Sequence, residues 1–128
     1  MDDLRPRPPS TRRLRRGRLS RSAEFERVYR QGRSHGNRHL VVHAFPRGAE
    51  DAPRLGVSVS RKVGGAVERN RVKRLLREAF AVEGAALAPG YDVVVVARPE
   101  ARELAARAGL EGVRESLREL LDQATRGR

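Results

Sequence analysis

Between positions 61 and 77 the sequence gathers side chains that could hold a polyanion. Seven basic residues lie in this stretch against the single acid Glu68, which leaves a net charge of +6. Arg69, Lys73 and Arg77 are like charges four residues apart, and on a helix this spacing is destabilising unless an anion neutralises it. Guanidinium groups bind phosphates bidentately, and ammonium groups bind them as point charges. The stretch therefore predicts a surface that binds a phosphate backbone.

A helix from about Ala66–Glu68 to about Val82 would position these groups. Its predicted core stripe has i, i+3, i+4, i+7, i+8 spacing and consists of Val72, Leu75, Leu76, Ala79 and Phe80. Four polar residues fall within about 100° of one another beside that stripe on a helical wheel, namely Asn70, Lys73, Arg74 and Arg77. Arg69 lies nearer to the apolar edge, where its stem would be part-buried. A merely solvated helix face is the plainer interpretation, but such faces usually mix charges at i, i+4.

Three histidines recur every four residues, at His35, His39 and His43, and raise two enzymatic possibilities. On a strand, His39 and His43 would be about 13 Å apart along its axis, whereas the ligands of one zinc ion each lie about 2 Å from it. The same separation argues against a general acid–base pair. The chain has no cysteine, so thiolate catalysis and disulfide partners are excluded. We expect no metal site and no catalytic residue in this chain.

The charge of the whole chain points in the same direction. The formal net charge is +12 and the pI is about 11.6, which predicts a polyanionic partner. Residues 1–17 are rich in arginine and proline with almost nothing apolar, so we expect a disordered basic N-terminal arm. No apolar run is long enough to span a bilayer, and no secretory signal is present. We therefore expect a cytoplasmic protein without a membrane partner.

The remaining elements predict one α+β domain, an α/β sandwich without internal repeats. A helix capped by Ser20 or Ser22 should run to about Arg30. Strands are expected at Arg38–Phe45, Arg54–Ser60 and Tyr91–Ala97, the last buried on both faces. On the second of these strands, alternate positions 56, 58 and 60 form a small, polar face. A last helical region would bury Leu110, Val113, Leu117, Leu120 and Leu121, and Gly109 and Gly112 leave its start open.

Two adjoining motifs carry a family resemblance. The segment Gly56-Val57-Ser58-Val59-Ser60-Arg61-Lys62, followed by Arg69-Asn70-Arg71 and Lys73-Arg74-Leu75-Leu76-Arg77, resembles the signature of the bacterial ribonuclease P protein component. The similarity covers roughly residues 18–122 and implies a ribonuclease P protein domain at 18–124. The implied fold has αβββαβα order with a left-handed βαβ crossover (ribosomal protein S5 domain 2-like). It includes a short additional strand near Arg33–Asn37 that the residue pattern does not predict.

The resemblance also implies a function. Members of the family assist a catalytic RNA that removes the 5′ leader from precursor tRNA, with Mg²⁺ bound in the active site of the RNA. We therefore expect a 1:1 heterodimer with that RNA, precursor tRNA as a second partner, and no cofactor bound by the protein alone. The residues implied to bind the catalytic RNA are Arg61, Lys62, Arg69, Asn70, Arg71, Lys73, Arg74 and Arg77. The alternative is a general RNA-binding or ribosomal protein without a nuclease role.

A cleft between the first helix and the sheet is implied to hold the single-stranded leader. Its residues would be Phe25, Tyr29, His43 and Ser58. Aromatic rings can stack on unpaired bases, which gives Phe25 and Tyr29 a physical reason to be there. Both could instead be core residues, although the hydroxyl of Tyr29 favours a wet edge. His43 occupies a position that is often aromatic in the family, so a leader contact there is in doubt.

Overall fold

The computed structural model describes residues 18–19, 22–48, 52–87 and 90–126. The predicted disordered arm at residues 1–17 lies outside them. The elements run in the order α2 (Ser22–Gln31), β1 (Arg33–Gly36), β2 (Leu40–Pro46), β3 (Arg54–Val59), α3 (Ala66–Glu83), the short 3₁₀ helix η1 (Gly84–Ala86), β4 (Tyr91–Ala97) and α4 (Ala101–Thr125). The order of helices and strands confirms the αβββαβα arrangement across the described part of the chain.

The four strands form one mixed sheet in the order β1-β2-β4-β3. β2 pairs antiparallel with both β1 and β4, whereas β3 pairs parallel with β4. A parallel pair needs a crossover connection, and α3 provides it between β3 and β4. β4 lies between two strands, and its side chains are covered on both faces of the sheet, which explains its continuous run of valines from Val93 to Val96.

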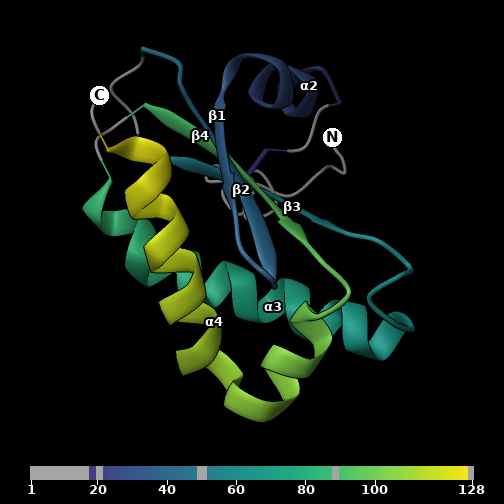
Figure 1. The fold of residues 1–128 in the computed structure, drawn as a ribbon. Coiled ribbons are helices and arrows are strands. Elements are labelled where there is room, and N and C mark those ends of the chain that lie inside the picture. Colours follow the sequence, from purple (N-terminus) through teal and green to yellow (C-terminus); the bar gives the residue numbers. More distant parts are fainter. Residues whose placement is uncertain (1–17, 20–21, 49–51, 88–89, 127–128) are drawn as a thin grey trace, which may run out of the picture.

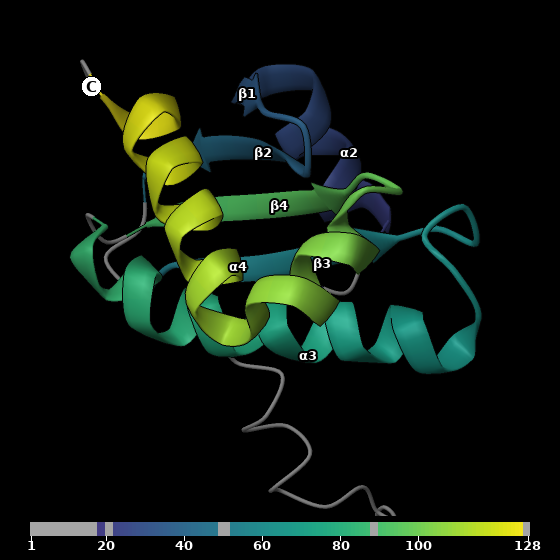
Figure 2. The same cartoon turned by 60° about the horizontal axis from the view of Figure 1, so that its bottom comes forward.

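The two faces of the sheet are covered unequally (Figures 1 and 2). Helices α3 and α4 pack on one face, which we call the two-helix face. There Val42, Val93 and Val95 join Leu76 and Leu117 in a large core of buried side chains. Helix α2 alone packs on the opposite face, which we call the one-helix face. The buried cluster on that face consists of Leu19, Val28 and Val94, with Phe25, Phe45 and Val96 half-buried around it.

Three strand boundaries differ from the predictions: β2 ends at Pro46 rather than Phe45, and the other two differences have an identifiable cause. β2 begins at Leu40 rather than Arg38, because the side-chain Oδ1 of Asn37 accepts hydrogen bonds from the backbone N–H groups of His39 (2.8 Å) and Leu40 (2.9 Å). This side chain closes a turn between β1 and β2. β3 ends at Val59, because the hydroxyl of Ser60 accepts a hydrogen bond from the backbone of Lys62 (3.2 Å). The additional strand implied by the resemblance is present as β1.

The last helix begins earlier than its glycines suggested. α4 starts at Ala101 and continues past Gly109, where φ is +59° and ψ is −148° and the helix is kinked. Glycine adopts a positive φ without the steric penalty of other residues, so the kink needs no other distortion. Of the predicted core positions, Leu110 is half-buried and Val113, Leu117, Leu120 and Leu121 are buried.

The described N-terminal residues lie along the free edge of β3. Arg18 forms a parallel bridge with Leu55, and the N–H of Leu19 donates a hydrogen bond to the carbonyl of Leu55 (2.8 Å). The side chain of Leu19 is buried on the one-helix face. Residue 18 is thereby held beside α3, which packs against β3.

Candidate nucleic-acid interface

The basic residues of α3 lie outside the core because the apolar stripe of the helix is buried against the sheet. All five predicted stripe residues are buried. The helix begins after Gly65, whose N–H donates a hydrogen bond to the Glu68 carboxylate (3.0 Å), and this contact satisfies one backbone donor at the helix start. Once the stripe is fixed against the sheet, the remaining side chains of α3 must face outward or sideways.

The eight residues expected to bind RNA lie on α3 and on the turn that precedes it. Asn70, Arg71 and Arg74 are exposed on the helix, and Arg61 and Lys62 are exposed in the turn. The other three are half-buried beside the core, namely Arg69, Lys73 and Arg77. The prediction that the stem of Arg69 is part-buried is confirmed. We call these eight residues the basic edge.

The basic edge is poorly neutralised by the protein itself. Within the part of the chain that the structure describes, Arg74 is its one member with a carboxylate partner, Glu78, at 4.0 Å. Both of these side chains are more than half exposed, so the pair contributes little stability. The Nε of Arg69 is buried and has no hydrogen-bond partner among the described residues. An unsatisfied buried donor is costly, and because this Nε has almost no exposed surface, a phosphate oxygen would reach it only after the side chain moved.

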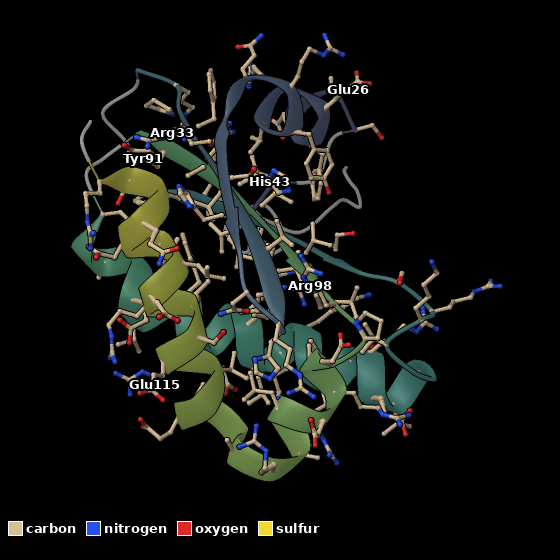
Figure 3. The ribbon with its side chains drawn as sticks, in the orientation of Figure 1. Glu26, Arg33, His43, Tyr91, Arg98 and Glu115 are labelled. Atoms are coloured by element: carbon tan, nitrogen blue, oxygen red, sulfur yellow. The ribbon has the colours of Figure 1, made fainter. Side chains whose placement is uncertain are left out.

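Three of the four expected cleft residues form a chain of aromatic contacts on the one-helix face. The ring of Tyr29 meets that of Phe25 edge-to-face at 6.3 Å between centroids and that of His43 at 4.9 Å. Tyr29 is 41% exposed, so it is not a core residue. Figure 3 shows His43 lying beneath α2, whereas Glu115 lies on α4. The structure thus brings together an α2 helix face and the middle of β2.

Phe25 belongs both to this aromatic chain and to the core. Its ring packs with the Leu19, Val28 and Val94 cluster. It also lies so close over Gly56 of β3 that a Cβ added there would be 2.6 Å from the ring. The Phe25 ring therefore packs on the small face that was predicted for β3. A hollow of about 620 Å³ opens beside it, lined by Ser22, Ala23, Phe25, Glu26 and Tyr29.

His43 and Ser58 do not line that hollow. His43 is half-buried, and burial lowers the pKa of its imidazole. Its Nδ1 is buried without a hydrogen-bond partner among the described residues. The edge-to-face contact with Tyr29 makes His43 part of the aromatic chain, but its buried Nδ1 is not accessible to a ligand in this structure. Ser58 is half-buried on β3 opposite Val96, two residues beyond Gly56.

The three histidines do not converge. His35 is on β1 opposite Val42, His39 lies in the turn before β2, and His43 is paired with Ser34. Over the described ranges, no three His, Cys, Asp or Glu side chains are placed to hold a metal ion. Within those same ranges, no helix is both long and apolar enough to cross a membrane.

A buried carboxylate was missed by the sequence analysis. Asp92 of β4 is fully buried, and its oxygens accept hydrogen bonds from Arg54 at 2.9 Å to each oxygen and from Arg47. Arg27 of α2 lies 3.9 Å from the same carboxylate, and Arg54 also pairs with Glu24 of α2 at 3.3 Å. This cluster ties α2 to the sheet. The available signal was an acidic residue at the start of an otherwise apolar strand.

Fold and site together define a small α+β RNA-binding protein, with a basic edge on one helix and a chain of aromatic rings, of which Tyr29 is exposed, on the opposite face of the sheet. The family model described as Ribonuclease P matches residues 14–125. The chain belongs to the bacterial ribonuclease P protein family. It is thus a protein component of a tRNA-processing ribonucleoprotein and associates with ribonuclease P RNA.

Individual relatives agree with this assignment. A ribonuclease P protein component from Shouchella clausii is 42% identical over 107 residues, which cover 84% of each chain. One from Bacillus pumilus is 45% identical over 89 residues, covering 70% of this chain and 75% of the relative. Among solved structures, the RNase P protein of Staphylococcus aureus superposes with a TM-score of 0.74 at 36% identity, covering 85% of this chain and 95% of that one. The Thermotoga maritima protein gives 0.73 at 34% identity, with 88% and 99% covered. A general RNA-binding or ribosomal role is not favoured.

Proposed function

We propose that the basic edge binds the catalytic RNA and that the aromatic chain of the one-helix face binds the 5′ leader of precursor tRNA. In this proposal the protein forms a 1:1 complex with the RNA in the cytoplasm. The RNA supplies catalysis with its own Mg²⁺, and the protein contributes binding without a cofactor of its own. The observation that carries the proposal is the basic edge, whose cations are almost without carboxylate partners in the described structure.

The basic edge and the aromatic chain suit different ligands because their side chains differ in chemistry. Cations in a row along a helix can contact successive phosphates, which gives strong binding to a structured RNA with little sequence preference. Exposed rings suit unpaired bases, because every base has a face that can stack. A leader is single-stranded, whereas mature tRNA has none, so the rings favour the substrate over the product.

The test is reconstitution of cleavage at low Mg²⁺ concentration with the catalytic RNA and precursor tRNA. We expect added protein to increase cleavage and the protein alone to cleave nothing. Replacing Arg69 or Arg74 with Ala should weaken RNA binding and lower the slope of log affinity against log salt by about one for each lost phosphate contact. Arg107→Ala, an exposed arginine on α4, is the matched control and should leave the slope unchanged.

Three results would contradict the proposal. Cleavage that does not respond to the protein would remove the role in processing. Cleavage by the protein without RNA would place catalysis in the polypeptide. Equal effects of Arg74→Ala and Arg107→Ala on the salt slope would mean that the basic edge is not the RNA contact.

A further inference from the structure

A second hollow lies where the last turns of α3 meet the edge of β3. Its volume is about 330 Å³, and its lining is mostly apolar. Leu55 and Phe80, which also belong to the core of the two-helix face, form part of it together with Pro53 and Ala81. Two side chains that line it are charged, and both are arginines, Arg18 and Arg77.

These two arginines come from distant parts of the sequence and are brought together by the fold. The bridge between residue 18 and Leu55 holds Arg18 at the sheet edge, and Arg77 projects from α3. Neither guanidinium has a carboxylate partner in the described part of the chain. Burial, and then the charge of Arg18, lower the pKa of Arg77. Two cations facing one hollow repel each other, and an anion bound between them would remove that repulsion.

We propose that this hollow binds one unpaired nucleotide of the catalytic RNA, with its base against Leu55 and Phe80 and its phosphate between Arg18 and Arg77. A planar, largely apolar group joined to an anion is the chemistry that such a lining accepts. Ligand sites commonly begin at about 300 Å³, so the hollow has room for one base and not for a duplex. This inference rests on the proposed function and adds a specific contact to it.

The catalytic RNA is favoured over the leader because of where the hollow lies. Arg77 belongs to the basic edge, so a strand following that edge reaches the hollow directly. The aromatic chain proposed for the leader is on the opposite face of the sheet. Residues 1–17 of this chain directly precede Arg18 and are another possible occupant. Their six arginines against two aspartates make them a poor partner for two further cations.

Filling the hollow without changing its charge tests the base contact. The Ala81→Leu variant places a larger side chain there, at an exposed position of α3 where leucine suits a helix. We expect affinity of the full-length protein for the catalytic RNA to fall about tenfold. Ala106→Leu, at an exposed position of α4, is the matched control and should bind like the parent. Equal affinity of the parent and Ala81→Leu would overturn the proposal.

Removing charge tests the phosphate contact. Arg18→Gln should lower the salt slope by about one, and Arg107→Gln should leave it unchanged. In the double variant Arg18→Gln, Ala81→Leu, the added Ala81→Leu change should lower RNA affinity less than it does in the parent, because both changes disrupt the same bound nucleotide. Fully additive losses would mean that the two side chains do not contact the same nucleotide.

The chain contains no cysteine, so a single introduced thiol can report what occupies the hollow. Ala81→Cys, labelled with a photoreactive aryl azide, should crosslink in the complex to a short unpaired segment of the catalytic RNA. Crosslinks to residues 1–17, to the leader, or evenly across the RNA as from an Ala106→Cys control would each overturn the proposal. Arg74→Ala separates this proposal from the proposed function. If Arg74→Ala lowers the salt slope while the variants of the hollow bind RNA like the parent, the basic edge still binds RNA and only the nucleotide site is wrong.

Discussion

The two faces of the sheet differ in how completely helices cover them. On the two-helix face, α3 and α4 enclose a core in which Val42, Val93 and Leu117 have no exposed surface. On the one-helix face, the ten-residue α2 covers a cluster of only three buried side chains and leaves Phe25 and Tyr29 partly uncovered. The stability of the domain therefore depends mainly on the first face. The second face can present rings to a ligand because it contributes less to the core.

The same comparison explains where charges are placed. On the two-helix face, α4 carries five acids against four arginines, and one of these arginines, Arg114, contacts Glu111 at 3.2 Å and Glu83 of α3 at 3.0 Å. α3 leaves the basic edge almost unpaired. Helix α4 thus covers the core with nearly balanced charge, whereas α3 covers it and leaves cations on its outer side for the RNA contact proposed above.

The largest expected effect is on the two-helix face. Leu117→Ala removes a fully buried side chain from the large core and should lower the free energy of unfolding by about 2–5 kcal/mol. Urea denaturation measures this loss. At urea concentrations where the variant is still folded, it should discriminate between precursor and mature tRNA as well as the parent does. Altered discrimination at full folding would mean that the two faces are coupled.

How far the sequence predicted the fold depended on periodicity. β4 has the predicted bounds, and α3 ends one residue beyond the prediction, because both have an unambiguous apolar pattern. β1 was not predicted from its residues: Arg-Ser-His-Gly has no apolar alternation, and this exposed edge strand is defined by backbone pairing to β2. The start of α4 was left open because of Gly109 and Gly112, and the structure shows that the helix begins at Ala101 and accommodates Gly109 as a kink.

The site divides in the same way. The basic edge was predictable because its helical members share one helix, whose phase follows from the core stripe. The Asp92 cluster and the hollow beside Arg18 combine residues from three or more segments, and no spacing along the sequence encodes such a meeting. Ser58 was assigned by resemblance alone, and it does not line the hollow beside Phe25.

The next effect concerns the attachment of α2. Asp92→Asn removes the charge that Arg27, Arg47 and Arg54 share and should cost about 3 kcal/mol of unfolding free energy. Because Arg27 is on α2, the variant should also lose affinity for leader-bearing substrate at temperatures where it remains folded. Asp122→Asn, which removes the exposed pair between this residue of α4 and Arg126, is the control and should change stability little. Similar losses of stability in both variants would mean that the buried Asp92 carboxylate stabilises the fold no more than an exposed ion pair does.

A smaller effect is expected at the exposed ring. Tyr29→Ala should weaken binding of leader-bearing precursor by about 1–3 kcal/mol and leave binding of mature tRNA unchanged, because only the precursor has a base to stack there. Binding of both RNAs to the reconstituted ribonucleoprotein is the measurement. Tyr29→Phe keeps the ring and should keep most of the affinity. Equal losses of affinity for precursor and mature tRNA would assign the ring a structural role and would contradict the proposal that the one-helix face binds the leader.

The smallest effect is a pH dependence at His43. Burial lowers the pKa of this imidazole in the folded protein from its ordinary value of 6.5, so the unfolded chain takes up the proton first as the pH falls. Unfolding is then favoured progressively below about pH 6.5, and this contribution levels off once the pH is below the folded pKa. His43→Gln cannot take up that proton, so between pH 8 and pH 5 it should lose less stability than the parent in urea denaturation. Equal losses would mean that the half-open face leaves His43 solvated, and that even its least exposed ring nitrogen is within reach of water.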